Sequence, residues 1–568
     1  MKKIFAIFVA KQAGFWSRIF GRGGGAALPG LLAMKIYPEI VKELTENLEK
    51  GVILVTGTNG KTTTSKMIVE ILEASGLKVL SNSGGSNLTR GIASELASKS
   101  NIFGKIKEEI GVYEVDEATM PEIINNLQFT IQNGLDSLPR RQAGRRSLSS
   151  EVWIPASAGM TKEDGNDSRQ RDSSAFTPKS FRESVGMTHA PFQGAGQAKE
   201  GGNNNLVKAI VITNIFRDQL DRYGEVDKTA AIIEEAIKNA PGAKLILNAD
   251  DPMVASLGLP SVISSETEET LEKNEKRDSS TRRFAKSVGM TNSQRQKIVL
   301  YFGIEDPRIS AGSELAIDSK DCLVCGNELN YSKRYYGHVG IYECPKCGFT
   351  RPNPKISAKD IKLNAENIST KITIKRESFE LKLPMVGLYN IYNALAATAV
   401  ASFLDIKSIT IAKTLSHLKP AFGRMESFEK DGKKAVIHLV KNPTGFNQVV
   451  EAISSTRKPK TALLILNDNF ADGTDISWIW DSEYEIFKNY FSNIIVSGIR
   501  SEDLRLRLKY ADVSSRIITV KKDIGEALEA AIKKTGPDEK LYILPTYTAM
   551  LELRNILVKE KILDNYWT

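Results

Sequence analysis

Short apolar runs alternate with amphipathic stretches along most of the chain. The run "GVILVTG" (51–57) predicts a buried strand, and "KTTTSKMIVEILEASG" (61–76) after it predicts a helix. Further apolar strands, each ending in polar residues, are expected at 78–85, 110–117, 209–215 and 243–251. A helix with one apolar face is expected at 226–240. Strands that alternate with helices predict a parallel sheet covered by helices on both faces.

A second series of strands and helices fills the last quarter of the chain. Its strands are expected at 434–440, 461–468, 490–498, 516–521 and 540–546. We therefore predict an α/β chain in three parts: an N-terminal segment at 1–49, a central domain at 50–422 and a C-terminal α/β domain at 423–568. Ligands of such sheets bind beyond the carboxyl ends of the strands, where the polar residues gather.

Two segments interrupt this pattern. Residues 136–203 and 270–297 are rich in Ser, Arg and Gly, and they share words such as "SVGMT", found at 184–188 and 287–291. Neither segment keeps a helical or strand periodicity, so both are interpreted as disordered surface insertions. A basic docking arm is the alternative interpretation.

The positive charge of the chain is concentrated in these segments. The net charge is +9, of which residues 136–200 contribute +2 and residues 272–297 contribute +5, leaving +2 for the rest. A nucleic-acid-binding protein needs a basic stripe on its folded core. The near-neutral remainder therefore argues against nucleic acid as a partner.

Length and apolar content indicate a cytoplasmic protein of two or more domains. The chain has 568 residues, and none of its apolar runs approaches the roughly 18–20 residues that cross a bilayer. The start, "MKKIFAIFVAKQ", is apolar only as far as Lys11, and no small-residue cleavage site follows. We expect an amphipathic N-terminus and no transmembrane segment.

The word "TGTNGKTTT" (56–64) predicts a nucleotide site, because it follows a strand and opens a helix. Gly57 and Gly60 allow the backbone to turn its N–H groups toward phosphate oxygens. Lys61 offers a charge to the β and γ phosphates, and the Thr62 hydroxyl suits Mg²⁺. The spacing G-x-x-G-K-T is shorter than the usual phosphate loop. The predicted nucleotide-binding residues of this loop are Gly57, Thr58, Asn59, Gly60, Lys61, Thr62 and Thr63.

Two CxxC pairs predict a metal site in the second half of the central domain. The pairs are Cys322 with Cys325 and Cys344 with Cys347, and 18 residues lie between them. A glycine follows the second cysteine of each pair. Such knuckles can place four thiolates tetrahedrally around Zn²⁺ with no position left for water, which predicts a structural zinc ribbon at 320–352.

Several words occur in the order found in the Mur ligase superfamily, which the chain resembles. They are "GTNGKTTT" (57–64), "SNSGGSNLTRGIA" (81–93), "YEVDEAT" (113–119), "ITNIFRDQLDRYGEVD" (212–227), "LNADDP" (247–252) and "LPMVGLYNIYNALAA" (383–397). The resemblance implies that ATP and Mg²⁺ bind, with Glu114 holding the metal beside Thr62. It also implies nucleotide contacts from Asn248, Asp251, Asn390 and Asn393. The chain departs from the family by Gln219 in place of a histidine beside Asp218. This departure weakens the expectation of a second metal held as in the amino-acid-adding ligases.

Two further features narrow the resemblance to one branch. About 50 residues precede the phosphate loop, too few for the UDP-sugar-binding domain of the amino-acid-adding ligases, and the ribbon interrupts the central domain. With "LVKNPTGFNQ" (439–448) and "NDNFADGTDISWIWD" (467–481), these features resemble the MurT family, the ligase subunits of lipid II isoglutaminyl synthases. The resemblance covers about 50–135, 206–265 and 298–568.

This resemblance implies ATP-dependent amidation of the D-glutamate α-carboxylate in the lipid II peptide stem, at the inner face of the cytoplasmic membrane. A GatD-type glutamine amidotransferase partner would supply ammonia, and an aspartate of 467–481 would complete the partner's catalytic triad. We favour Asp481, then Asp475, over Asp468 and Asp472. Trp478 and Trp480 would anchor the interface or pack in the core.

Two rival functions and one minor assignment stay open at this stage. A folylpolyglutamate synthase-like amino-acid ligase also lacks the UDP-sugar domain, but it requires neither the ribbon nor the tryptophan-rich word. A phosphate-loop protein that binds nucleic acid through the ribbon is the other rival. Lys441 of "KNPTG" (441–445) is either a contact for the acceptor or phosphate, or a surface residue.

Overall fold

The computed structural model describes residues 1–19, 27–82, 87–128, 206–217, 226–259, 299–309, 320–364, 367–419, 424–454 and 460–564. Both expected insertions, the boundary expected between 422 and 423, and Asp218 with Gln219 lie outside these residues. Across the described ranges, no helix is both long and apolar enough to span a membrane.

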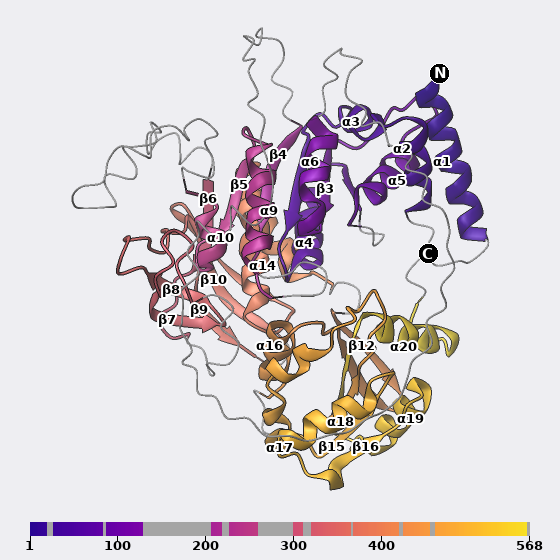
Figure 1. Cartoon of the computed structure of the whole chain (residues 1–568), viewed down its shortest axis with the longest axis vertical. Coiled ribbons are helices and arrows are strands. Elements are labelled where there is room, and N and C mark those ends of the chain that lie inside the picture. Colours follow the sequence, from indigo (N-terminus) through magenta and orange to yellow (C-terminus); the bar gives the residue numbers. More distant parts are fainter. Residues whose placement is uncertain are drawn as a thin grey trace, which may run out of the picture. The chain divides into compact units, whose positions relative to one another are not determined.

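Three helices precede the first strand (Figure 1): α1 (Lys2–Ile19), α2 (Leu28–Ile36) and α3 (Ile40–Thr45). They pack against α5 (Thr89–Lys99). The approach of α2 to α5 requires a glycine, because a Cβ on Gly30 would lie 1.9 Å from the backbone oxygen of Arg90. Residues of α1 and α3 belong to the same apolar core as strand β1 (Val52–Thr56). The N-terminal segment therefore forms part of the helical layer over the central sheet.

Nine strands form the larger sheet, in the order β11-β10-β9-β6-β5-β4-β1-β3-β2. The other bounds are β2 (Val79–Ser81), β3 (Ile110–Glu114), β4 (Val207–Ile212), β5 (Lys244–Asn248), β6 (Val299–Ile304), β9 (Ile356–Leu363), β10 (Ile368–Ile374) and β11 (Glu377–Leu383). The run from β2 to β9 is parallel, as predicted, whereas β10 and β11 are antiparallel. The antiparallel edge was not anticipated; its strands alternate buried and exposed residues, which suits a sheet with one solvated face.

Alternate residues of β1 face the two layers of helices. Val52 and Leu54 pack in the core that contains α5, α6 (Met120–Gln128), α9 (Val226–Lys238) and α10 (Pro252–Ser256). Ile53 and Val55 pack in the core that contains α4 (Lys61–Ala74), α14 (Tyr389–Phe403) and α15 (Ser408–Ser416). The period of two along a strand sends successive side chains to opposite faces, so a strand between two helical layers is apolar throughout.

The C-terminal part of the chain builds a second sheet of six strands, in the order β12-β13-β17-β14-β15-β16. The bounds are β12 (Arg424–Lys430), β13 (Lys433–His438), β14 (Thr461–Ile465), β15 (Asn493–Ser497), β16 (Ile518–Val520) and β17 (Lys540–Pro545). Only the β12–β13 pair is antiparallel among these described strands. Helices cover both faces: α16 (Pro443–Ser454), α17 (Phe487–Tyr490) and α18 (Ser501–Tyr510) on one, α19 (Ile524–Lys534) and α20 (Tyr547–Lys559) on the other.

A separate two-stranded hairpin, β7 (Asn330–Tyr336) and β8 (Val339–Glu343), lies between β6 and β9 in the chain. All four cysteines lie at the open end of this hairpin, two before β7 and two after β8. The hairpin occupies the position at which the sequence predicted a ribbon.

Candidate functional site

The loop between β1 and α4 has a backbone that requires glycine at two positions. Gly57 and Gly60 have φ angles of 119° and 88°. These angles lie in the left-handed region that side chains disfavour. A Cβ on Gly60 would also lie 2.1 Å from Oδ1 of Asn393, so the loop passes close against α14. Helix α4 begins directly afterwards at Lys61. Its first N–H groups and its dipole favour an anion such as phosphate at this loop.

Residues that follow β4 hold the loop in place. The Asn59 N–H donates to Oδ1 of Asn214 at 2.9 Å, and the Asn59 carbonyl accepts from Oγ1 of Thr213 at 2.7 Å and Nδ2 of Asn214 at 3.0 Å. The Thr58 hydroxyl donates to the Phe216 carbonyl at 3.1 Å and accepts from the Phe216 N–H at 2.9 Å. Because both ends of the loop are fixed, a ligand meets a site that is already formed.

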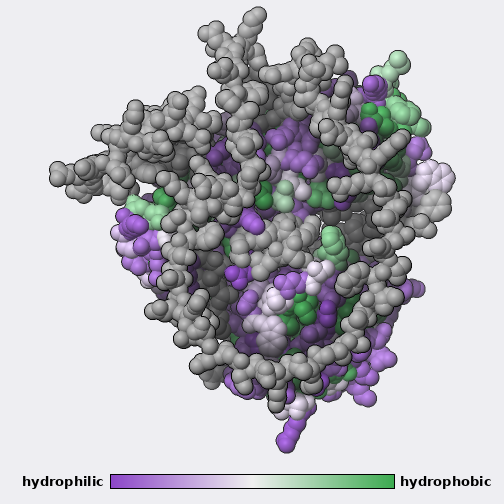
Figure 2. All heavy atoms as spheres, in the orientation of Figure 1, coloured by the Kyte–Doolittle hydropathy of each residue, from purple (hydrophilic) through white to green (hydrophobic). Residues whose placement is uncertain are grey.

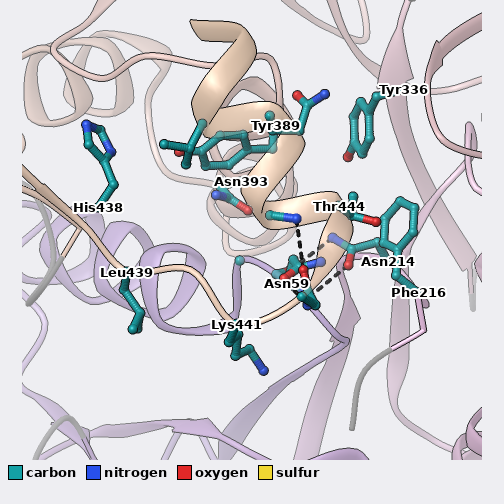
Figure 3. A pocket seen from close by; sticks show the side chains of 15 residues that line it. Asn59, Asn214, Phe216, Tyr336, Tyr389, Asn393, His438, Leu439, Lys441 and Thr444 are labelled. Atoms are coloured by element: carbon teal, nitrogen blue, oxygen red, sulfur yellow. Dashed lines mark hydrogen bonds between the residues drawn. The ribbon is translucent and has the colours of Figure 1, made fainter. Parts of the chain in front are cut away.

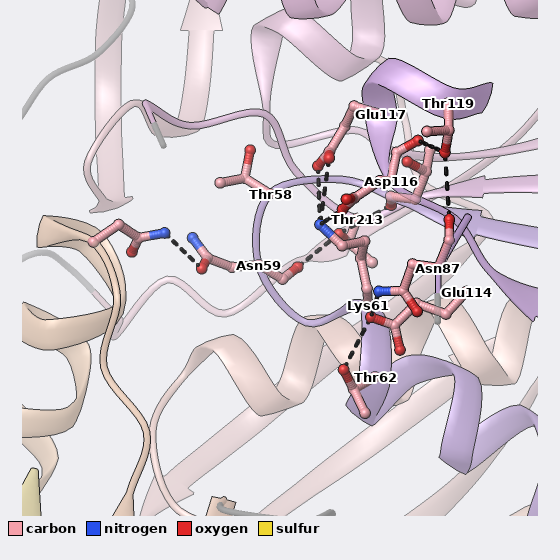
Figure 4. Close-up of polar contacts among 12 residues, drawn as sticks. Thr58, Asn59, Lys61, Thr62, Asn87, Glu114, Asp116, Glu117, Thr119 and Thr213 are labelled. Atoms are coloured by element: carbon pink, nitrogen blue, oxygen red, sulfur yellow. Dashed lines mark hydrogen bonds and ion pairs between the residues drawn. The ribbon is translucent and has the colours of Figure 1, made fainter. Parts of the chain in front are cut away.

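Lys61 is buried and paired with two acids (Figure 4). Its Nζ lies 3.1 Å from Oε1 of Glu117 and 3.8 Å from Oδ1 of Asp116. The ammonium is only 8% exposed, and a charge so deeply buried needs such partners. The two acids hold the lysine at the loop to which a phosphate would bind.

Thr62 and Glu114 form the second polar cluster at this loop. The Thr62 hydroxyl donates to Oε1 of Glu114 at 3.1 Å, and Nδ2 of Asn87 donates to the same oxygen at 2.9 Å. Asn82 fixes the strand end that carries the acid, since its side chain bonds both the N–H and the carbonyl of Glu114 at 2.8 Å. A hydroxyl and a carboxylate side by side are ligands that a hard cation such as Mg²⁺ prefers.

A pocket opens beside the loop (Figure 3). Asn59, Gly60 and Asn393 contribute to one side of it, and the aromatic rings of Phe216, Tyr336 and Tyr389 line it as well. Its remaining lining comes from the C-terminal domain, namely His438, Leu439, Lys441, Asn442, Thr444, Gly445, Gln448 and Val449, together with Asn214. Aromatic and amide side chains in one pocket suit a nucleotide base and its polar edge.

The two domains meet at this pocket through a hydrogen bond. Nδ2 of Asn442 donates to Oδ1 of Asn59 at 3.0 Å, and Oδ1 of Asn442 accepts from the Gly445 N–H at 2.8 Å. Lys441, whose role was left open, lines the same pocket. His438 is fully buried, and burial, together with Lys540, lowers its pKa to about 4.

The predicted asparagines of α14 lie next to the loop. Asn393 accepts from the Thr64 hydroxyl at 3.2 Å and donates to Oδ1 of Asn390 at 3.0 Å. Asn390 in turn donates to the Val386 carbonyl at 2.7 Å. Of the two, only Asn393 is among the described residues that line the pocket. Asn390 accepts a hydrogen bond from Asn393 and so helps to orient it.

Asn248 and Asp251 are engaged in structural hydrogen bonds. Asn248 donates to the Thr213 carbonyl at 3.1 Å and accepts from the Asp250 N–H at 3.1 Å. Asp251 caps α10, and its Oδ2 accepts from the Ile215 N–H at 2.9 Å. Both side chains are fully buried, and neither is among the described residues that line the pocket. Their predicted contact with a nucleotide stays a prediction, as does that of the buried Thr63.

The four cysteines form one cluster. Sγ of Cys322 lies 3.6 Å from Sγ of Cys347, Sγ of Cys325 lies 3.5 Å from Sγ of Cys344, and all four sulfurs lie within 4.8 Å of one another. Four thiolates bound at about 2.3 Å to a tetrahedral Zn²⁺ would be separated by about 3.8 Å. The donor set and its spacing therefore fit a metal with no open coordination position.

The hairpin of this cluster packs directly on the rest of the central domain. The Tyr342 hydroxyl donates to the Ala249 carbonyl at 3.1 Å, and Nε of Arg351 donates to Oδ1 of Asp250 at 2.6 Å. Burial raises the pKa of Asp250, although Arg351 opposes that rise. The ring of Tyr336 stacks on Phe216, with a centroid separation of 5.8 Å. The hairpin that carries the cysteine cluster thus contacts residues that adjoin the phosphate loop.

The four aspartates of the acidic loop (466–481) differ in what they contact. Asp468 pairs with Nε of Arg500 at 2.7 Å, and Asp472 is buried and accepts from the Thr548 N–H at 2.7 Å. Burial raises the pKa of Asp472, although the hydrogen bonds from Thr548 oppose that rise. Asp475 and Asp481 are exposed. Of the four aspartates, those two are the exposed ones.

The tip of the loop is a short 3₁₀ turn, η2 (Ser477–Asp481). Asp475 accepts from the Ser477 N–H at 2.8 Å, which caps the turn. Asp481 makes no hydrogen bond or ion pair with any residue in the part of the chain that the structure describes. The buried Arg507 fixes the backbone of the turn. Its guanidinium donates to the carbonyls of Ile479 at 3.0 Å and Ser482 at 2.7 Å. The Asp481 carboxylate is therefore presented on a fixed backbone.

The two tryptophans of the turn have different environments. Trp478 packs against the C-terminal core and lies 6.3 Å from the Phe446 ring. Trp480 is 47% exposed and lies edge-on to the exposed ring of Tyr510 at 5.5 Å. Core packing thus accounts for Trp478, whereas Trp480 remains at the surface.

Sequence reasoning missed several residues that the fold brings to the site. Asp116 and Glu117 stand in the word "YEVDEAT", from which only Glu114 was selected. Thr213 and Asn214 stand in "ITNIFRDQLDRYGEVD", and Asn442 stands in "KNPTG". The signal was present in each case, since every one of these residues lies inside a family word.

Models of two families match parts of the chain. The MurT ligase C-terminal family matches residues 439–550, and the Mur ligase middle domain matches residues 314–401. Curated relatives cover almost all of it. The "Lipid II isoglutaminyl synthase (glutamine-hydrolyzing) subunit MurT" of Staphylococcus aureus is 30% identical over 97% of this chain and 96% of its own. The subunit of the same name from Streptococcus pneumoniae is 29% identical over 95% and 94%.

Solved structures of lower identity share the fold. A pseudomurein peptide ligase type C from Methanothermus fervidus superposes with a TM-score of 0.54 at 21% identity, covering 90% of this chain and 79% of that one. MurF from Acinetobacter baumannii superposes with a TM-score of 0.53 at 15% identity, covering 93% and 81%. The chain therefore has the fold of a Mur ligase, as its sequence predicted.

Proposed function

The chain belongs to the MurT family of Mur ligase-like proteins, and on this premise we propose that it is the ligase subunit of a lipid II isoglutaminyl synthase. In that role it amidates the peptide stem of lipid II during peptidoglycan synthesis, with glutamine as the source of nitrogen. The observation that carries the proposal is that one chain has both a formed phosphate-binding loop and the exposed Asp481 on a rigid turn. Asp481 makes no hydrogen bond or ion pair with the described residues.

The first step energises a carboxylate. A carboxylate is a poor acyl donor, since its leaving group would be oxide. An oxygen of the D-glutamate α-carboxylate attacks the γ-phosphorus of ATP, which gives an acyl phosphate and releases ADP. Lys61 neutralises charge that develops on the transferred phosphoryl group. Glu117 and Asp116 position the lysine for that contact.

Thr62 and Glu114 are the residues proposed to hold Mg²⁺, because their oxygens lie 3.1 Å apart at the phosphate loop. The ion would neutralise negative charge on the phosphate groups when bound. The predicted nucleotide contacts from Asn248, Asp251, Asn390 and Asn393 belong to the same proposal, and the pocket favours Asn393 among them.

The second step delivers nitrogen. Ammonia attacks the carbonyl carbon of the acyl phosphate, the C–O bond to phosphate breaks, and the nitrogen loses a proton as the amide forms. The products are D-isoglutamine in the stem, ADP and phosphate. Lys441 and Asn442 line the pocket on the side of the C-terminal domain and are our candidates for contacts with the acceptor or phosphate.

The ammonia comes from a glutamine amidotransferase partner of the GatD type, which hydrolyses glutamine. Asp481 reaches into the partner's site and orients its catalytic histidine, as the acid of a Ser-His-Asp triad does. Asp475 is the second candidate. The exposure of both acids and the exposed ring of Trp480 beside them support an interface at this turn.

The cysteine cluster holds structural Zn²⁺ in this proposal, since four thiols leave no position for a reacting water. The chain acts at the cytoplasmic face of the membrane, where its lipid-linked acceptor is made. The folylpolyglutamate synthase-like alternative is not favoured, because relatives that cover nearly the whole chain carry the synthase name. A nucleic-acid-binding protein has no support from these relatives.

The decisive assay uses the chain purified together with its amidotransferase partner. We expect glutamine-dependent amidation of lipid II that consumes ATP. Lys61→Ala should lower that amidation by about 10²–10³-fold, because a charge on the transferred phosphoryl group is lost, while glutamine hydrolysis by the partner continues. If the purified pair hydrolyses glutamine but uses no ATP with lipid II, the proposed function is wrong.

A further inference from the structure

Helix α1 is apolar on two opposite faces. Ala6, Ile7 and Ala10 are at most 2% exposed and pack in the central core. The other face carries five large apolar side chains that remain substantially in solvent: Ile4 at 42%, Phe5 at 58%, Phe8 at 51%, Phe15 at 55% and Trp16 at 52%. A helix packed on one side only would normally have polar residues on the other.

The exposed residues form one stripe, called here the outer face of α1 (Ile4, Phe5, Phe8, Phe15 and Trp16). Ile4 and Phe8 are four residues apart, which places them on the same side of the helix. Phe15 and Trp16 follow Ile4 and Phe5 by eleven residues, about three helical turns, so they lie on that side as well. Figure 2 shows hydrophobic residues gathered at the N-terminal end of this helix. A contiguous apolar patch of this kind marks a site of interaction.

The chain before Glu39 contains basic side chains but no acidic one. Lys2 is exposed at the start of the helix, whereas Lys3 pairs with Glu43 at 3.1 Å on the packed side. Aromatic residues on one side of a helix with lysine and arginine beside them are the composition of helices that lie in the interface of an anionic bilayer. A second copy of the same face would bring like charges together, which disfavours self-association.

The inner face of α1 fixes its orientation. The helix packs on α2 and α5, and Nζ of Lys11 donates to the Ser98 carbonyl at 2.8 Å. The helix is therefore held flat against the domain, so its outer face can enter a membrane surface only sideways. Such a geometry suits shallow burial in the headgroup region.

We propose that the outer face of α1 docks on the surface of an anionic phospholipid bilayer and so holds the enzyme at the membrane that carries its acceptor. The inference rests on the proposed function for that acceptor. Phe5, Phe8, Phe15 and Trp16 enter the headgroup region, and the exposed Lys2 faces the lipid phosphates.

The test measures binding of the full chain, with its partner, to vesicles of phosphatidylglycerol and phosphatidylcholine. Sedimentation with the vesicles should be strong, and it should weaken with salt or with phosphatidylcholine alone. Phe5→Ser/Phe8→Ser should lower the partition coefficient about tenfold or more, since two half-exposed rings lose their burial. Lys2→Glu should lower it about fivefold, on anionic vesicles only.

A matched control uses two apolar residues that are exposed elsewhere. Ile409 is 72% exposed and Leu363 is 45% exposed, and Ile409→Ser/Leu363→Ser should leave vesicle binding unchanged. Thermal unfolding of each double variant should match the parent, because all four side chains point into solvent.

Activity separates this inference from the proposed function. The Phe5→Ser/Phe8→Ser variant should amidate lipid II embedded in vesicles about tenfold more slowly than the parent. It should amidate a water-soluble analogue with a short lipid tail at the parent rate. Failure of the parent to amidate the soluble analogue would count against the proposed function alone. Failure of the parent to bind anionic vesicles, or equal binding by the double variant, would overturn the membrane surface. Loss of the amidotransferase partner from the double variant would show instead that the outer face contacts protein.

Discussion

The phosphate loop and the acidic loop differ in whether their charged groups are already paired. Lys61 and Glu117 are at most 8% exposed and lie 3.1 Å apart, whereas Asp481 is exposed and contacts no charged group in the described part of the chain. The first site is complete within this chain. The second presents an exposed charge on a rigid turn, and no described residue pairs with it.

This difference predicts which substitutions alter both stability and activity and which alter activity alone. A substitution among buried, paired charges at the phosphate loop alters the folded state as well as the reaction, since it leaves a charge without its partner. A substitution at an exposed, unpaired acid leaves the folded state almost unchanged.

Asp481→Asn should abolish most glutamine hydrolysis by the complex while leaving the fold intact. Replacing the acid of a catalytic triad by its amide lowers the rate about 10⁴-fold, because the histidine loses its orientation and its counter-charge. Amidation of lipid II should return when an ammonium salt replaces glutamine, since the ligase half-reaction is untouched. Unfolding of the isolated chain should shift by less than about 0.5 kcal/mol.

Asp475→Asn and Asp468→Asn are the matched controls within the same loop. Asp468 is already paired with Arg500, so its loss should destabilise the loop modestly and spare glutamine hydrolysis. Asp475→Asn removes the charge but keeps an oxygen that can accept from the Ser477 N–H, so at most a small loss of hydrolysis is expected. A large loss with Asp475→Asn and none with Asp481→Asn would transfer the triad role to Asp475.

The sequence predicted most of the fold because its signals are local. The strand–loop–helix pattern at 51–76, the spacing of the four cysteines and the word "DGTDISWIWD" each determine structure over a few turns. The parallel sheets and the cysteine cluster were therefore predicted correctly. The antiparallel pairs at the sheet edges were missed, since a strand does not reveal by itself the direction of its neighbour.

The sequence could not reveal which polar residues meet across long separations. Glu117 rather than Asp116 is nearest to Lys61 because of a single 3₁₀ turn, η1 (Glu117–Thr119). Asn442 reaches Asn59 only because two domains fold against each other. Likewise, four aspartates of one loop look equivalent in the sequence, and burial and pairing distinguish Asp472 and Asp468 from the other two only after folding.

Acid should destabilise the C-terminal domain through His438. Burial lowers its folded pKa to about 4, below the ordinary value of 6.5, so the folded state favours the neutral imidazole. The resulting stability is fully present above pH 6.5 and is lost as the pH falls toward 4. The shift corresponds to about 3 kcal/mol.

The measurement is the free energy of unfolding from pH 8 to pH 4 for the parent and for His438→Gln. The variant should show a flatter curve between pH 6.5 and pH 4, by about 3 kcal/mol. Equal curves would mean that His438 is not held neutral by the fold.

Glu117→Gln should destabilise the chain when nucleotide is absent. Breaking a buried ion pair costs about 3–5 kcal/mol, and Asp116, still 3.8 Å from Lys61, should reduce that cost to about 2 kcal/mol. Added ADP should recover more stability in the variant than in the parent, since phosphate supplies the missing negative charge. Thermal unfolding with and without ADP measures both effects.

Glu46→Gln is the control for a carboxylate at the surface. Glu46 forms only a loose pair with Lys42 at 4.0 Å on α3, and its removal should cost less than about 0.5 kcal/mol. If Glu117→Gln were equally mild, the phosphate loop would not depend on its buried pair, and the contrast between the two loops would disappear.

Chelation of a metal that the cysteine cluster holds should have the smallest effect, and the effect should be on ATP binding alone. The hairpin carries Tyr336, whose ring stacks on Phe216, and Phe216 is hydrogen-bonded to Thr58 of the phosphate loop. Loosening the hairpin should therefore weaken ATP binding about fivefold, since an aromatic pair contributes about 0.5–1.5 kcal/mol beyond its area. Chelation followed by calorimetric titration with ATP measures it, and Tyr336→Ala should reproduce the loss, whereas Tyr336→Phe keeps the ring and should bind normally. Glutamine hydrolysis should not change in any of these samples, because the turn that carries Asp481 is held by Arg507 in the other domain, through the Ile479 and Ser482 carbonyls. A fall in hydrolysis on metal removal would mean that the two loops are coupled through the fold, and that the acidic loop depends on this chain for more than its own turn.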